Sequence, residues 1–167
     1  MRLLALGLAL LLAGCASPAP QADAEGKGPD WSLTALDGSV HTRDAPPGNA
    51  TVLFFMATWC GSCRAKAPVL ADVLADAEER GVRVYSVGFD PSESPEELRA
   101  WQERHRHGWP IGVDEELRVA RAFGVRSQSS VVVLDADGRV VQHFGYGQVT
   151  DEGLRAALER ALRRDAA

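Results

Sequence analysis

Two cysteines separated by two residues, Cys60 and Cys63, lie between an apolar run and a segment with helical spacing. The run, 51–56, reads Thr-Val-Leu-Phe-Phe-Met and is typical of a strand buried on both faces of a sheet. After the cysteines, apolar residues recur at the intervals of a helix. The pair therefore stands at a strand-to-helix junction, and this position constrains the fold more than any other feature.

The same position gives the two thiols their chemistry. Positive charge at a helix N-terminus lowers the pKa of a thiol there, and only the thiolate attacks a disulfide. The motif therefore predicts that Cys60 and Cys63 form and break a disulfide with each other. Two alternatives are a structural disulfide and half of a zinc site. Zinc needs further Cys or His ligands at metal spacing, and the sequence has no second C-x-x-C motif.

The N-terminal 14 residues have the pattern of an export signal. Arg2 is followed by a Leu- and Ala-rich run that is short for a bilayer span. The small residues before Cys15 resemble a bacterial lipobox, which implies cleavage before Cys15 and lipid attachment to its sulfur. The alternative is an ordinary signal peptide with an incidental cysteine. We expect a lipoprotein signal peptide over 1–14, a lipidated flexible tether over 15–29 and one domain over 30–165.

The net charge of the chain excludes some classes of binding partner. The formal net charge of the chain is −5, which argues against nucleic acid or anionic lipid headgroups as binding partners. The sequence indicates no cofactor and no set of metal ligands. An oxidising compartment outside the cytoplasm makes a redox-active cysteine pair chemically reasonable.

Apolar periodicity and turn residues predict an α/β domain with a mixed sheet and helices on both of its faces. Asp37-Gly38 is typical of a hairpin turn, and Pro68 predicts a kink in the helix that carries the cysteines. The expected elements are a hairpin over 31–42, a strand over 51–56, a helix ending at Arg80 before Gly81, a strand over 82–88, helices over 95–105 and 115–123, a hairpin over 131–144 and a helix over 150–164.

Three motifs carry a resemblance to a known family. Pro29-Asp30-Trp31, Ala57-Thr58-Trp59 before Cys60, and Gly124-Val125-Arg126 resemble the TlpA/ResA-like thiol–disulfide oxidoreductases of the thioredoxin superfamily. The resemblance implies a thioredoxin fold with an N-terminal β-hairpin and a βα unit inserted around 91–113. It also implies a lipid-anchored protein of the cell envelope that faces the periplasm or extracytoplasmic space. There it would reduce or exchange protein disulfides and be recharged by an upstream thiol reductant.

The sequence departs from that family where a cis-proline normally faces the sulfurs. When the two sequences are aligned from Gly124, the position of that proline is occupied by Ser129, which follows Gln128. A cis bond before a residue other than proline costs about 3–4 kcal/mol, so we expect a trans Gln128–Ser129 peptide. In the superfamily this proline is thought to orient substrate and to keep metals off the thiols. We expect Ser129 to offer a hydroxyl or an N–H to a thiolate or a substrate.

Two further departures concern proton transfer. Many relatives carry Glu six residues after the first cysteine, where this chain has Lys66. A cation facing the site would favour thiolates, whereas the alternative is that Lys66 extends into solvent. Thioredoxins proper have a buried acid where this chain has Phe54, so the sequence leaves the proton-transferring group unidentified.

Other candidate residues are aromatic or histidine side chains. Trp59 is interpreted as an aromatic wall for substrate, with surface packing as the alternative. His105 and His107, flanked by arginines, are interpreted as a solvated helix end rather than a metal pair. His41 and His143 are expected to be structural or solvent-facing.

The leading prediction is a lipid-anchored thiol–disulfide oxidoreductase with Cys60 as nucleophile and Cys63 as resolving residue. One alternative is a copper-binding or copper-delivering module that uses the same two cysteines. The other is a peroxiredoxin-like peroxidase, although the usual Thr three residues before the peroxidatic Cys is replaced by Ala57.

Overall fold

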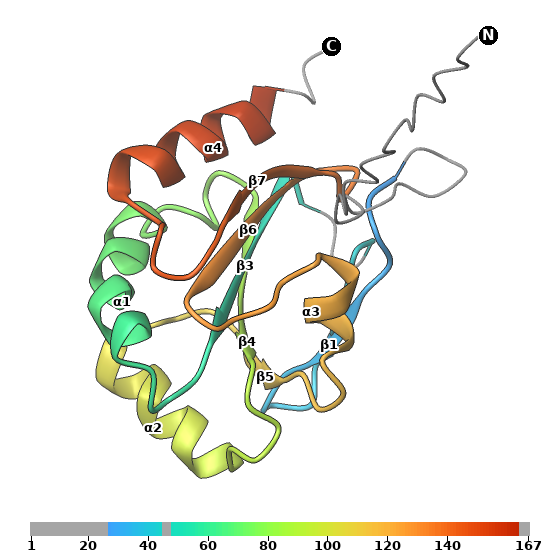
Figure 1. Ribbon diagram of the computed structural model, residues 1–167. Coiled ribbons are helices and arrows are strands. Elements are labelled where there is room, and N and C mark those ends of the chain that lie inside the picture. Colours follow the sequence, from blue (N-terminus) through green and yellow to red (C-terminus); the bar gives the residue numbers. More distant parts are fainter. Residues whose placement is uncertain (1–26, 45–47, 164–167) are drawn as a thin grey trace, which may run out of the picture.

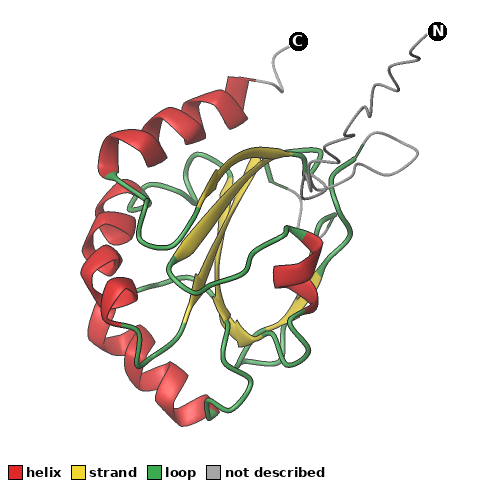
Figure 2. Cartoon of the chain, viewed as in Figure 1, coloured by secondary structure: helices red, strands yellow, loops and turns green. Residues whose placement is uncertain are grey.

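The computed structural model describes residues 27–44 and 48–163 (Figure 1). The chain forms both strands and helices, which Figure 2 distinguishes by colour, and the two alternate only in its middle part. The elements are β1 (Ser32–Thr34), β2 (Val40–Thr42), β3 (Ala50–Met56), α1 (Gly61–Val73), β4 (Val82–Gly88), α2 (Pro95–His105), β5 (Ile111–Val113), α3 (Arg118–Ala122), β6 (Ser130–Asp135), β7 (Val140–Phe144) and α4 (Asp151–Arg163).

The main sheet is mixed, as predicted. Its five strands have the order β5-β4-β3-β6-β7, and β1 pairs with β2 in a separate hairpin. Strand β3 runs parallel to β4 and antiparallel to β6, so it lies in the middle of the sheet. The predicted insertion is also present, since α2 and β5 follow β4 and place β5 at the sheet edge.

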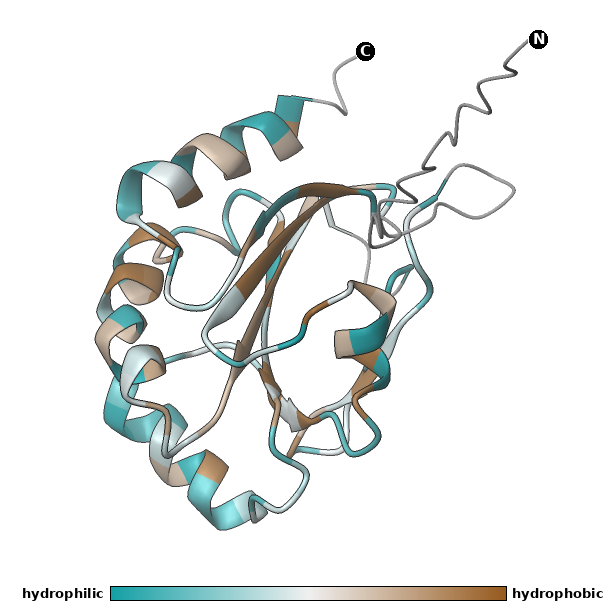
Figure 3. Cartoon of the chain, viewed as in Figure 1, coloured by the Kyte–Doolittle hydropathy of each residue, from teal (hydrophilic) through white to brown (hydrophobic). Residues whose placement is uncertain are grey.

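Layers on both faces bury the sheet. Alternate residues of β3, including Val52 and Phe54, pack with α1, α2 and α4 on one face. Leu53 and Phe55 point to the other face, where they meet α3 and Trp31 beside the β1–β2 hairpin. Figure 1 shows the two layers on opposite sides of the strands, and Figure 3 shows the apolar colour of β3 and β6. Because successive side chains of a strand point to opposite faces of the sheet, this one short apolar run contributes residues to both cores.

Helix α1 is shorter than predicted. It ends at Val73, and tight turns such as Ala77 N–H to Leu74 O carry the chain to Gly81, whose φ is +70°. Leu74 and Ala77 are buried in these turns, as they would be in a helix. The apolar spacing was therefore right, but it did not distinguish a helix from successive turns.

Helix α3 also starts later than the sequence predicted. Asp114 accepts the backbone N–H groups of Val119 and Ala120 at 3.2 and 2.9 Å. The intervening Leu117 has a φ of +52°, which is outside the helical region. The acids at 115 and 116 belong to a turn, and the helix begins only at Arg118.

The predicted signal peptide, Cys15 and most of the tether lie outside the described residues. Near the tether's expected end, Gly28 N–H donates to Asp137 O at 3.0 Å, next to the β6–β7 turn. Contacts with the domain thus begin before Asp30. Within 27–44 and 48–163, no helix combines the length and the apolar character needed to cross a bilayer.

Candidate active site

The two cysteines lie at the beginning of α1. Cys60 is the N-cap residue, and its sulfur accepts the N–H of Cys63 at 3.1 Å. The two residues form a disulfide, with Cα atoms 5.2 Å apart, and both are buried. A sulfur at an N-cap is next to unpaired helix N–H groups, which stabilise negative charge. When the disulfide is reduced, this position favours the Cys60 thiolate.

A tight turn connects β3 to this helix. Cys60 N–H donates to Ala57 O at 3.0 Å, which closes the turn through Thr58 and Trp59. The Trp59 side chain is 57 % exposed, and its indole N–H donates to Asp90 Oδ2 at 2.8 Å. Hydrogen bonds from Ser92 and then from Trp59 lower the pKa of Asp90. The ring thus presents aromatic surface beside the disulfide, while its role as a wall for substrate stays a prediction.

Ser129 lies against the residue pair between the cysteines. Its hydroxyl is 2.9 Å from the Ser62 hydroxyl, and its carbonyl accepts the N–H of Gly147 at 2.9 Å. Ser129 is fully buried with a φ of +59°. Proline holds φ near −65°, so this backbone does not accommodate the proline of the family. The residue that the family alignment selected thus contacts Ser62, while its left-handed backbone was not predicted.

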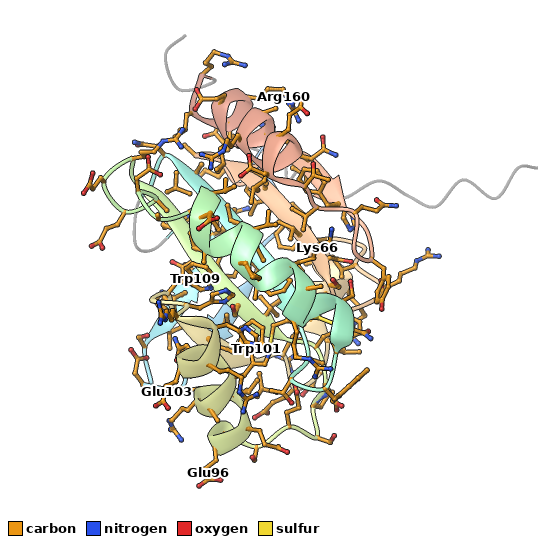
Figure 4. All side chains as sticks on the ribbon, turned by 90° about the vertical axis from the view of Figure 1, so that its left-hand side faces the viewer. Lys66, Glu96, Trp101, Glu103, Trp109 and Arg160 are labelled. Carbon is orange, nitrogen blue, oxygen red and sulfur yellow. A yellow bond between two sulfur atoms is a disulfide. The ribbon has the colours of Figure 1, made fainter. Side chains whose placement is uncertain are left out.

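The roles expected of Gln128 and Lys66 at the site stay predictions. Gln128 is half-buried beside Ser129, and the trans peptide between the two residues is not tested. Lys66 lies on α1 (Figure 4) and is half-buried. Among the described residues no carboxylate lies within ion-pair distance of Lys66, so its charge is not neutralised by a direct partner there.

Behind the site, an aromatic and histidine cluster replaces the buried acid of thioredoxins. Phe54 packs with Trp101 and His107 at ring distances of 6.1 and 6.4 Å. His107 is 3 % exposed, its Nε2 lies 3.2 Å from Ala67 O, and its ring stacks on Trp109. Figure 4 shows Trp101 and Trp109 close to α1 and α2. Burial lowers the pKa of His107 to about 4, so the ring is neutral at neutral pH.

The interpretation of His107 as part of a solvated helix end is therefore wrong. Arg106, which ends α2, has a φ of +54°, and this left-handed residue turns His107 back toward the core. His105 is half-buried against Trp101. No group of three or more His, Cys, Asp or Glu side chains suited to a metal forms within the described ranges. His41 is half-buried and lies 2.8 Å from the Ser39 hydroxyl, whereas His143 is exposed on β7, as expected.

One acid at the site, Glu93, was not predicted from the sequence. Glu93, in the connection between β4 and α2, is 8 % exposed and accepts the N–H of Thr58. Burial is the main cause that raises the pKa of Glu93. Its position directly before the Ser94 cap of α2 suggested only a helix start, and no local pattern links it to the cysteines 30 residues earlier.

The site combines a disulfide at a helix N-terminus with an exposed tryptophan on a thioredoxin-like sheet. This arrangement defines the protein as a thioredoxin-like thiol–disulfide oxidoreductase. The chain belongs to the AhpC/TSA family, whose model matches residues 24–143.

Curated relatives agree with this class. A thiol-disulfide oxidoreductase ResA from Geobacillus kaustophilus is 29 % identical over 132 residues, which cover 78 % of this chain and 74 % of that protein. The thioredoxin-like protein YneN from Bacillus subtilis is 27 % identical over a match that covers 78 % of this chain and 76 % of YneN.

Solved structures support the fold. A putative thiol:disulfide interchange protein DsbE from Chlorobium tepidum gives a TM-score of 0.70 at 24 % identity, covering 81 % of this chain and 95 % of that chain. A putative thioredoxin from Neisseria meningitidis gives a TM-score of 0.73 at 21 % sequence identity, covering 83 % of this chain and 92 % of that chain.

We predict that His107 makes stability depend on pH. A histidine with a lowered pKa binds fewer protons in the folded than in the unfolded protein. Stability is therefore lost as pH falls from 6.5, the ordinary pKa of a histidine, toward about 4. The full loss from this group is about 3 kcal/mol. Urea unfolding between pH 7 and 4 should give a shallower pH slope for His107→Gln than for the wild type. His143→Gln is the comparison variant: burial also lowers the pKa of His143, but less than that of His107, so this variant should change the slope less. Equal slopes in all three proteins would contradict this assignment.

A second prediction concerns the backbone of Ser129. Ser129→Gly accepts the φ of +59° and loses only the hydroxyl contact with Ser62, at a cost of about 1 kcal/mol. Ser129→Pro also forces the backbone to change, so its unfolding free energy should fall below that of the glycine variant by more than about 1 kcal/mol. Denaturant unfolding of the two variants measures the difference. A proline variant as stable as the glycine variant would show that this backbone is not required.

Proposed function

We propose that the protein is a membrane-anchored extracytoplasmic thiol–disulfide oxidoreductase that exchanges or reduces the disulfides of other proteins. The observation that supports this most is the Cys60–Cys63 disulfide at the N-cap of α1. The predicted export signal and the lipobox-like residues before Cys15 support the location, and the names of the curated relatives support the reaction class. The lipid on Cys15 would hold the domain at the membrane, and an upstream thiol reductant would regenerate the dithiol.

The reaction starts from the reduced pair. The Cys60 thiolate attacks one sulfur of a partner disulfide, a new S–S bond forms, and the partner's other sulfur leaves as a thiolate that takes a proton from water. Cys63 then loses its proton and attacks the Cys60 sulfur. This step closes the Cys60–Cys63 disulfide and releases the second partner sulfur. The partner gains the two electrons that the cysteine pair loses.

The geometry suits these roles. Both cysteines are buried in the oxidised form, so a partner must approach through the surface formed by Trp59 and the exposed N-terminal turn of α1. Aromatic side chains such as Trp59 provide contact area at a low cost in conformational entropy. The Ser62–Ser129 contact places two hydroxyl groups next to the motif, where they are available to hydrogen-bond a sulfur or a partner backbone.

Substitution of the cysteines tests this function. Cys60→Ser should reduce the rate of disulfide exchange with a model protein disulfide such as insulin to below about one per cent, because no attacking thiolate remains. Cys63→Ala should retain the attack and accumulate a mixed disulfide through Cys60, visible by non-reducing electrophoresis and mass spectrometry. Equal residual activity in the two variants would contradict the assigned roles.

Cys15→Ser is the matched control because it removes a cysteine from outside the site. It should keep full exchange activity in solution and move the protein from the membrane fraction to the soluble fraction. Measurement of copper bound to the reduced protein, and of peroxide consumption, tests the two alternative functions on the same preparations.

A further inference from the structure

Helix α1 differs from the other two long helices in the charges of its first turns. Helices α2 and α4 each have two acids in the first turn, where the positive end of a helix favours negative charge. Helix α1 has no acid in its first turn, and its first two turns carry Arg64 and Lys66. Cations at this end of a helix reduce its stability, so the needs of the helix do not explain these two residues.

The Arg64 side chain turns back over the residues around Cys60. Its Nη1 donates to Thr58 O at 3.4 Å, and its Nη2 lies 3.8 Å from the position that a Cβ atom on Gly61 would occupy. The guanidinium group is therefore next to residues on both sides of Cys60 in the sequence. Because Arg64 is exposed, its charge faces the surface through which a partner reaches the sulfur.

Lys66 places a second cation on another side of the motif. It lies one turn after Ser62, and residues four apart share a face of a helix, with Cβ atoms about 6 Å apart. Ser62 contacts Ser129, and its Oγ lies 2.9 Å from the position of a Cβ atom on Gly147. This face of α1 thus meets the β7–α4 connection, and Figure 4 shows Lys66 on that side of the helix. The two cations therefore flank the start of α1.

The acids nearest to the motif do not cancel these charges. Asp90 lies on the Trp59 side, where it accepts the indole N–H. Burial is the main cause that raises the pKa of Glu93, which favours its neutral form. Asp151, at the start of α4, binds Arg155 through two hydrogen bonds. Among the described residues, no ion pair joins a carboxylate to either cation of α1. The α1 side of the disulfide is therefore cationic.

A partner chain passes close to both cations. The proposed reaction brings a partner cysteine to Cys60, and Lys66 lies about 9 Å further along the axis of α1. Two or three residues of an extended chain span about 7–10 Å, so side chains at these positions reach the cations. The whole chain has a net charge of −5, but at 0.1 M salt charges act over only about 10 Å, so the local cations dominate there.

We propose that the surface around Cys60 selects partner disulfides flanked by acidic side chains, which Arg64 and Lys66 attract. This inference rests on the proposed exchange reaction and names its substrate class, a disulfide in an extended segment with Asp or Glu two or three positions from the reactive cysteine. Arg64 and Lys66 determine specificity and take no part in the bond exchange. Complementary charge raises the rate at which such a partner meets Cys60.

Three peptides that differ only in charge test the proposal. Each has one internal disulfide, with Glu, Ser or Lys at the second and third positions on both sides of each cysteine. The measurement is the second-order rate constant of their reduction by the reduced full-length protein at pH 7, in salt of about 0.01 M and about 1 M. The readout is the ratio of the Glu-peptide rate to the Lys-peptide rate, because a changed reactivity of Cys60 alters all rates alike and leaves this ratio unchanged.

The variants are Lys66→Gln and Arg64→Gln. The matched control is Arg163→Gln, which removes the same charge from an exposed residue at the far end of α4. We expect the wild type to reduce the Glu peptide at least about tenfold faster than the Lys peptide in low salt, and high salt to remove most of this preference. Each of the two α1 variants should lower the ratio about threefold, and the control should keep the wild-type ratio.

A ratio that is the same in the wild type and in both α1 variants would overturn the proposal. Equal slowing of all three peptides would do the same, since it would show that the cations act only on the reactivity of Cys60. If the variants do not fold, the salt dependence of the wild type decides: added salt should slow reduction of the Glu peptide and speed that of the Lys peptide, and rates that ignore salt contradict the proposal. A wild type that reduces none of the peptides would instead refute the proposed function.

Discussion

The position of Cys60 at the end of a fully buried central strand is the constraint on which the site depends. All seven residues of β3 are buried, with β4 and β6 on its two sides, so the strand end has little freedom to move. One tight turn later, Cys60 caps α1, and its sulfur accepts a backbone N–H of that helix. The sheet thereby fixes the sulfur where the helix N-terminus stabilises its ionised form.

The parts of the fold that could be predicted are those with a strong local signal. The run 51–56 is apolar at every position but the first, and α2 begins with Pro95 followed by two acids, so both elements were predicted close to their observed bounds. The end of α1 was not predicted correctly, because Leu74 and Ala77 are buried in the turns after the helix just as they would be in a longer helix. His107 was misread because its arginine neighbours indicate solvent, whereas the left-handed Arg106 directs it inward.

In the candidate site, too, some residues were predicted from the sequence and others were not. Spacing identified the cysteine pair, and the resemblance to the family, aligned from Gly124, predicted Ser129 opposite it. Glu93 is the residue that the sequence did not reveal, since its contact with Thr58 joins segments 35 residues apart. With Phe54 at the position of the usual acid and a neutral His107 behind it, Glu93 is the buried carboxyl group that contacts the turn before the nucleophile. Groups from different segments therefore contact this turn: Arg64 donates to Thr58 O, and the acids of residues 89–94 accept hydrogen bonds from Thr58 and Trp59.

The proposed function requires Cys60 and Cys63 to be a redox pair and their bond not to be a purely structural disulfide. An equilibrium titration of the purified protein with reduced and oxidised dithiothreitol, followed by counting of alkylated thiols by mass spectrometry and by far-ultraviolet circular dichroism, tests it directly. The account predicts one reversible two-electron transition in which both thiols appear together while the fold is unchanged. Loss of secondary structure on reduction, or cysteines that resist reduction until the protein unfolds, would contradict it.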